Sequence, residues 1–159
     1  MDGGEPPEIT YAAHDLATGR WKNISLAVWR ARPAVESAAA LREHYLALAK
    51  SFPDGFFSFG TIEAGVPNPD EPARKAISAA MDAVQRELLG AAFVVEDTGF
   101  GAAALRATLA TMSMLTRSRF PRRFFSSVDD AAAWTARQMP DLGGAGALVS
   151  SFAYFRLRI

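Results

Sequence analysis

The chain has 159 residues, of which 50% are hydrophobic and 21% charged, and this composition is typical of one folded domain with a core of its own. The 17 Lys and Arg residues balance the 17 Asp and Glu residues, which disfavours nucleic-acid binding. The absence of cysteine excludes disulfides, thiol nucleophiles and Cys-ligated metals. The sequence offers neither a signal-peptide pattern nor an apolar run of roughly 18 residues that would span a membrane, so we expect a cytoplasmic protein.

A disordered start and a hairpin are predicted at the N-terminus. Residues 1–8 combine Gly, Pro and acids and are expected to be disordered. A strand is predicted over residues 9–14, and Gly19 marks a hairpin turn into a second strand over residues 21–29. The fold therefore opens with two antiparallel strands.

Helices and strands alternate in the middle of the chain. The spacing of apolar residues predicts amphipathic helices over residues 33–52 and 72–89, the second closed by Gly90. Aromatic and β-branched residues predict a strand over residues 56–63. Residues 91–96 are apolar almost throughout, as expected of a central parallel strand covered on both faces.

The C-terminal third continues this order. A third helix over residues 102–116 is apolar nearly all round, and a short strand over residues 123–126 follows it. Ser127 caps a last clear helix, which runs to about residue 139. Residues 141–159 form either a terminal helix or an added strand. The chain is thus a single α/β domain with a mixed, mostly parallel sheet.

One segment carries a family resemblance. Residues 120–134, FPRRFFSSVDDAAAW, lead from the last short strand into the closing helix. Together with the order of elements, this segment resembles the STAS-like, SpoIIAA-like superfamily of small bacterial domains. The resemblance implies a STAS-like domain over residues 9–140, with a four- or five-stranded sheet and helices packed on it, and a C-terminal extension over residues 141–159. It also implies regulation or binding rather than catalysis.

The same resemblance points to one hydroxyl group. Anti-sigma-factor antagonists of this class carry a phosphorylatable serine in an Asp-Ser-Ser-Gly-Leu-Gly turn. The sequence DTGFG is similar but one residue shorter, and it follows the second crossover strand rather than the first. Thr98 is the matching hydroxyl, and its phosphorylation is left open. A looser branch of the superfamily resembles lipid-binding CRAL-TRIO domains and has no phosphosite. The residues of this turn are Asp97, Thr98, Gly99, Phe100 and Gly101.

Acidic residues are expected at the carboxyl ends of the strands, where ligands meet α/β sheets. Glu63, Glu96 and Asp97 lie there, and three acids near one edge suit a cation. The N–H groups of residues 99–101 suit an anion. We favour the simpler interpretation, in which Asp97 or Thr98 caps a helix and the glutamates face solvent. No metal and no cofactor is expected.

Catalytic groups are scarce in the sequence. His14 and His44 are the only histidines, and neither has an acid or hydroxyl at a diagnostic spacing. We expect His44 on the helix surface, beside the apolar stripe of the first helix. No Gly-x-Ser-x-Gly motif occurs, so the sequence does not predict an enzyme.

Two surface features suggest a partner. Residues 98–128 contain five arginines and no acid, which suits an anionic partner, although we favour pairing of these arginines with nearby acids. Arg119 and Arg122 are the members to test first. The third helix suits self-association or a protein partner, and its interface residues are Leu105, Leu109, Met112 and Met114.

These observations predict a non-catalytic regulatory or protein-interaction domain, forming a homodimer or binding a protein partner. Glu63 and the turn over residues 97–101 belong to the expected binding surface. The alternative is a carrier or sensor of a small apolar, lipid-like ligand, housed between the sheet and four aromatic side chains. Those aromatic residues are Trp29, Phe57, Phe59 and Phe93.

Overall fold

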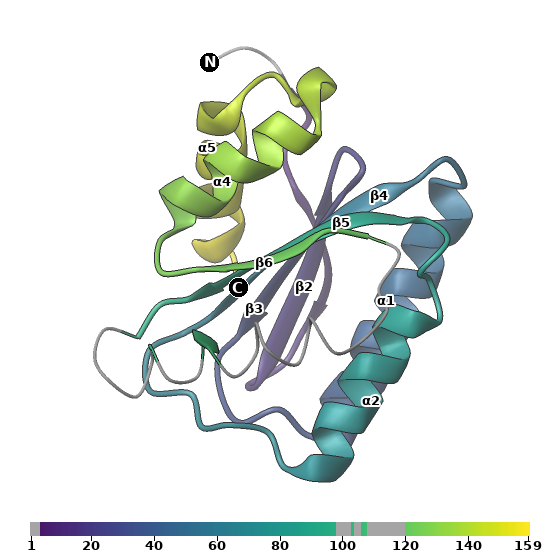
Figure 1. Cartoon of the computed structure of the whole chain (residues 1–159), viewed down its shortest axis with the longest axis vertical. Helices are drawn as coiled ribbons and strands as arrows, with labels where there is room; N and C mark the ends of the chain where they lie inside the picture. Colours follow the sequence, from purple (N-terminus) through teal and green to yellow (C-terminus); the bar gives the residue numbers. More distant parts are fainter. Residues whose placement is uncertain (1–3, 98–102, 104–105, 108–119) are drawn as a thin grey trace.

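The computed structural model describes residues 4–97, 103, 106–107 and 120–159, which place a mixed sheet between two layers of helices (Figure 1). Six strands lie side by side in chain order, so the α/β class is confirmed, but the predicted number of four or five strands is wrong. The first three strands pair antiparallel and the remaining pairs are parallel. The strands are β1 (Glu8–Ala12), β2 (Leu16–Trp21), β3 (Ile24–Trp29), β4 (Phe56–Ile62), β5 (Leu88–Val95) and β6 (Arg122–Phe125).

The extra strand is β2, which occupies the segment predicted to be a hairpin turn. Gly19 lies inside this strand. Glycine is required at this position, because a Cβ atom would come within 2.6 Å of the Phe155 ring and 2.7 Å of the Glu8 carbonyl oxygen. The turn between β2 and β3 instead falls at residues 22–23, where Lys22 adopts a positive φ of 51°. Five of the six residues of β2 are buried, so the strand lacks the polar alternation that marks a half-exposed strand.

Substitution of Gly19 tests this close approach. We expect Gly19→Ala to lower the free energy of unfolding by about 1–3 kcal/mol, because the added methyl group overpacks the space between the Phe155 ring and β1. Gly146→Ala is the matched control, since a Cβ at Gly146 meets nothing within 4 Å. It lies in a helix and is expected to stabilise the protein by up to about 1 kcal/mol. Urea denaturation of both variants makes the comparison, and equal effects would contradict the described packing.

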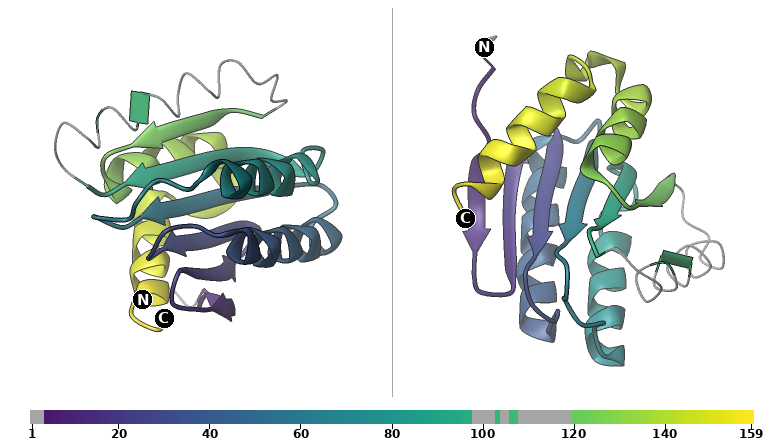
Figure 2. Two further views of the ribbon diagram at one scale, coloured as in Figure 1. Left: turned by 90° about the horizontal axis from the view of Figure 1, so that it is seen from below. Right: turned by 90° about the vertical axis from the view of Figure 1, so that its left-hand side faces the viewer.

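Two helices, α1 (Val35–Ser51) and α2 (Glu71–Asp82), connect parallel strands and lie on one face of the sheet, as Figure 2 shows. The helix α2 ends well before the predicted boundary at residue 89. Gly90 therefore does not close a helix but lies inside β5, where a Cβ would come within 2.5 Å of the Phe57 ring. The carboxylate of Asp70 caps α2 by accepting a hydrogen bond from the Ala73 N–H at 2.9 Å.

The opposite face of the sheet is covered by α4 (Val128–Gln138), the short 3₁₀ turn η1 (Pro140–Leu142) and α5 (Ala145–Arg156). The predicted cap is confirmed: the Ser127 hydroxyl accepts a hydrogen bond from the Asp130 N–H at 3.2 Å. The C-terminal tail, for which a helix and a strand were both open, is helical. Among the described residues, no helix combines the length and apolar character needed to cross a membrane.

Each face of the sheet has its own core. Phe57 and Phe59 pack under α4 and α5, whereas Trp29 and Phe93 pack on the side of α1 and α2. Phe59 contacts Phe152 of α5 edge to face, with ring centroids 5.1 Å apart. The four aromatic residues predicted to line one ligand cavity are therefore divided between two faces, because alternate residues of a strand point to opposite sides.

Candidate functional site

The carboxyl ends of β4 and β5 bring two predicted site residues together. Glu63 and Glu96 follow these parallel strands directly, so the sheet places their carboxylates at one edge. Arg156, in the last turn of α5, lies between them. Its Nη2 donates to Glu63 at 3.0 Å, and its Nη1 contacts the two carboxylate oxygens of Glu96 at 2.8 and 2.9 Å. The expectation that both glutamates simply face solvent is therefore wrong.

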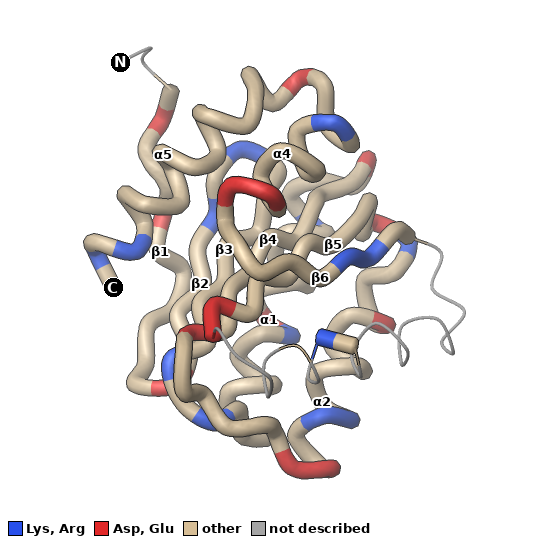
Figure 3. The backbone as a smooth tube through the Cα atoms, turned by 60° about the vertical axis from the view of Figure 1, so that its left-hand side comes forward, with Lys and Arg blue, Asp and Glu red and all other residues tan. Residues whose placement is uncertain are grey.

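Two arginines lie among three carboxylates at this edge of the sheet, and Figure 3 shows that basic and acidic residues are interspersed along the rest of the described chain. Burial lowers the pKa of Arg156, but the hydrogen bonds and negative charges of Glu96 and Glu63 outweigh burial and raise this pKa above its usual range. Arg30 adds a second positive charge 4.0 Å from Glu63. The Asp97 carboxylate accepts a hydrogen bond from the Gly65 N–H at 3.3 Å. Among the described residues, no group of three or more His, Asp or Glu side chains could hold a metal ion.

Removal of Arg156 tests whether this cluster is structural. We expect Arg156→Met to lower the free energy of unfolding by about 1–2 kcal/mol, since two partly buried carboxylates lose a shared donor and repel each other. The control is Arg158→Met, because among the described residues the Arg158 guanidinium contacts the Tyr154 ring and no carboxylate. Thermal and urea denaturation measure both variants. A cost no larger for Arg156→Met than for Arg158→Met would contradict a structural role.

Most of the predicted partner surface lies outside the described residues. This applies to Thr98, Gly99, Phe100, Gly101 and Arg119, and to the interface residues Leu105, Leu109, Met112 and Met114.

Arg122 is described, and its guanidinium lies over the Phe120 ring at 4.8 Å. Burial lowers its pKa, which the negative charge of Asp82 partly opposes. The buried Nε of Arg122 has no hydrogen-bond partner, and within the described part of the chain its guanidinium forms no ion pair with an acid. The favoured pairing of the arginines with nearby acids is therefore wrong for this residue.

His44 was expected on the surface of its helix, and this prediction is wrong because the side chain is buried. His44 is only 6% exposed. Both ring nitrogens form hydrogen bonds with hydroxyl groups, Nδ1 with Thr10 and Nε2 with Ser25, each at 2.9 Å. Burial, followed by the positive charge of Arg20, lowers the pKa of His44 to about 4. The imidazole is therefore neutral at pH 7. Its spacing of three from Leu41 and four from Leu48 was the signal for an inward position.

The contact between Ser25 and His44 has the geometry of a nucleophile and its base, but Ser25 is completely buried. A substrate cannot reach this hydroxyl. The next residue of α1 makes a similar contact with the sheet, because the Tyr45 hydroxyl lies 2.9 Å from the Ser58 hydroxyl of β4. Both contacts join α1 to the sheet, so we interpret them as structural.

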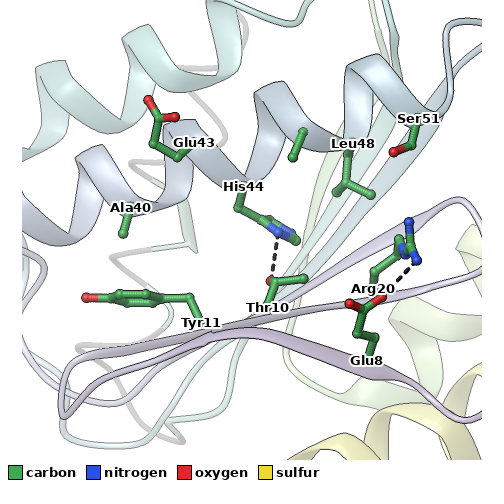
Figure 4. Close-up of a pocket in the computed structure, with 10 residues that line it drawn as sticks. Glu8, Thr10, Tyr11, Arg20, Ala40, Glu43, His44, Leu48 and Ser51 are labelled. Carbon is green, nitrogen blue, oxygen red and sulfur yellow. Dashed lines mark hydrogen bonds and ion pairs between the residues drawn. The ribbon is translucent and has the colours of Figure 1, made fainter.

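An open groove of about 540 Å³ lies beside His44, between β1 and α1 (Figure 4). Its strand wall holds an ion pair, with the Arg20 guanidinium 2.8 Å from the Glu8 carboxylate. Its helix wall is made by residues spaced three and four apart, several of them small, and small side chains leave the space unfilled. The lining residues are Glu8, Thr10, Tyr11, Arg20, Ala40, Glu43, His44, Ala47, Leu48 and Ser51.

Comparisons with known proteins add no identification. Protein-family models, curated proteins and solved structures were each compared with the chain, and none matches it.

Proposed function

We propose that this chain is a non-catalytic protein-interaction domain of STAS-like type. The observation that carries the proposal is the edge strand β1, whose five residues are all exposed beside an open groove. Edge strands and adjoining grooves are a recurrent way to bind polypeptide. The acid–base groups of the described residues support the non-catalytic part, because His44 is bonded to two hydroxyls and Glu63 and Glu96 are bonded to Arg156.

The chain also supports the family resemblance at its closing elements. The strand β6 leads through the capping residue Ser127 into α4, as the resemblance implies. The six-stranded sheet departs from the expected four or five strands. The proposal also includes a regulatory role, self-association and membership of the bacterial STAS-like class.

The carrier alternative finds less support. Its expected cavity required Phe57 and Phe59 to face the same space as Trp29 and Phe93, and these pairs lie on opposite faces of the sheet. A carrier function would need a different site, and the open groove between β1 and α1 does not enclose a ligand.

Native mass spectrometry of the freshly purified protein tests the proposed function. We expect the bare chain, as a dimer or bound to a second protein, with no added small-molecule mass. A monomer carrying a non-covalent small molecule would overturn the interaction-domain proposal in favour of a carrier. The same spectrum reports a covalent phosphate, and so tests phosphorylation.

A further inference from the structure

We propose that the groove between β1 and α1 binds a short, extended, basic peptide segment of a partner protein, which adds to the free edge of β1. The proposal rests on the proposed interaction function and names the surface and the chemistry of the partner. Three observations lead to it: the unpaired strand edge, the shape of the helix wall, and the charge of the lining.

The strand edge supplies main-chain hydrogen-bonding groups. In the described sheet β1 has one neighbour, β2, so its other edge is not paired with a strand. A peptide in extended conformation satisfies such groups by adding a strand, and its alternate side chains then enter the adjoining groove. Figure 4 shows α1 running above this strand, with His44 reaching down to Thr10 and other lining residues of the groove on both sides of that contact.

The length of the helix wall fits a short segment. The wall extends from Ala40 to Ser51, a rise of about 16 Å along the helix axis. About five residues of extended chain cover the same distance. Ala40 and Ala47 are small, and Leu48 supplies an apolar floor, so the groove accommodates side chains that the protein itself does not provide.

The charge of the lining selects a basic occupant. Arg20 is already paired with Glu8, as the dashed line in Figure 4 shows. The other carboxylate, that of Glu43, forms no hydrogen bond or ion pair with the described residues. Tyr11, which is 38% exposed, adds an aromatic ring to the lining. A carboxylate and an aromatic ring together favour a Lys or Arg side chain.

A second copy of β1 is a poorer occupant. The sequence of β1, EITYA, contains a glutamate and no Lys or Arg. A second copy of this strand would therefore place no positive charge beside Glu43 and would bring a further carboxylate to the groove. We therefore expect the segment to come from a different protein.

Selection of random seven-residue peptides on the immobilised full-length protein tests the proposal, followed by fluorescence anisotropy with the selected peptides. We expect the selected peptides to share a Lys or Arg. Charge reversal by Glu43→Lys should weaken their binding about tenfold or more and shift selection toward Asp and Glu. Glu36→Lys, which makes the same charge change on α1 outside the groove lining, should leave binding within about twofold.

Filling the groove provides a second, uncharged test. Ala47 is exposed, so Ala47→Trp keeps the core intact, and we expect it to abolish peptide binding. Ala39→Trp places the same side chain at another exposed position of α1, outside the lining, and should have no effect. N-methylation of the peptide amides at odd positions and at even positions should have different effects. Only one of the two sets should weaken binding, because alternate amides point to opposite edges of a strand and only one set faces β1.

The outcomes separate this inference from the proposed function. Peptides that bind Ala47→Trp and Glu43→Lys as well as they bind the unchanged protein would overturn the groove but leave an interaction domain. Selection that enriches no peptide would also overturn the groove proposal. Enrichment of the β1 sequence, with loss of a dimer in Ala47→Trp, would assign the groove to a second copy instead. The proposed function itself falls only on the mass-spectrometric result given above.

Discussion

Replacement of Phe152 by alanine is expected to lower the free energy of unfolding by about 3–5 kcal/mol. Phe152 is 1% exposed and packs edge to face on Phe59 at 5.1 Å, so its ring joins α5 to the middle of the sheet. Truncation removes a large buried apolar surface and leaves a cavity that a rigid sheet cannot close. Urea denaturation at pH 7, with a common slope for both proteins, measures the loss.

Leu157 provides the control for this prediction. It follows α5 directly and is 86% exposed, so Leu157→Ala should change the free energy of unfolding by no more than about 0.5 kcal/mol. If Phe152→Ala cost less than about 1 kcal/mol, α5 would not be a part of the core.

The second large effect is a dependence of stability on pH that comes from His44. The pKa of His44 is about 4 in the folded protein, against 6.5 for an unperturbed histidine. Between these two values the unfolded state binds more protons than the folded state, so stability falls as the pH falls. The difference corresponds to about 3 kcal/mol, fully present above pH 6.5 and lost by about pH 4.

Histidine variants isolate this contribution from the titration of the carboxylates. We expect His44→Gln to be less stable than the unchanged protein at pH 7 but to lose about 3 kcal/mol less between pH 7 and pH 4. His14→Gln is the control for the exchange itself, because the His14 side chain is 88% exposed and its replacement should change the free energy of unfolding at pH 7 by no more than about 0.5 kcal/mol. Urea denaturation across this range makes the comparison. Parallel curves for His44→Gln and the unchanged protein would show that His44 is accessible to protons in the folded state.

The sequence predicted those elements whose cause is local. The stripe of α1, the apolar run of β5 and the Ser127 cap are set by residues a few positions apart, and the structure contains all three. The helix α1 differs from the predicted range by no more than two residues at either end, because its spacing pattern extends over 17 residues.

The errors have non-local causes. Gly19 and Gly90 were interpreted as turn and helix-end residues, which is their commonest use, but here each glycine makes room for a ring from another element. These rings belong to Phe155 and Phe57, and no local pattern relates either ring to its glycine. The strand β2 was missed for the same reason, because its glycine and its buried polar residues conceal the alternation.

The candidate site follows the same division. Parallel topology was enough to predict that Glu63 and Glu96 converge, whereas their partner Arg156 comes from 93 and 60 residues further along the chain. The burial of His44 depends on Thr10 of β1 and Ser25 of β3, which are distant from it in the sequence. The groove depends in turn on how β1 lies under α1, and that is set by the contact between Thr10 and His44.

The position of α5 has a consequence for the order in which the chain can complete its fold during synthesis. The apolar residues on one face of β2 and β3 share a core with Phe152 and Phe155. The Lys22 ammonium also donates a hydrogen bond to the Leu142 carbonyl, 120 residues away, at 3.0 Å. At 5–20 residues per second, roughly 6–24 s separate the synthesis of these two ends. During that interval the N-terminal strands expose an apolar face that α5 later covers. We therefore expect nascent chains that end before residue 145 to associate with chaperones, and release from them to follow the emergence of α5.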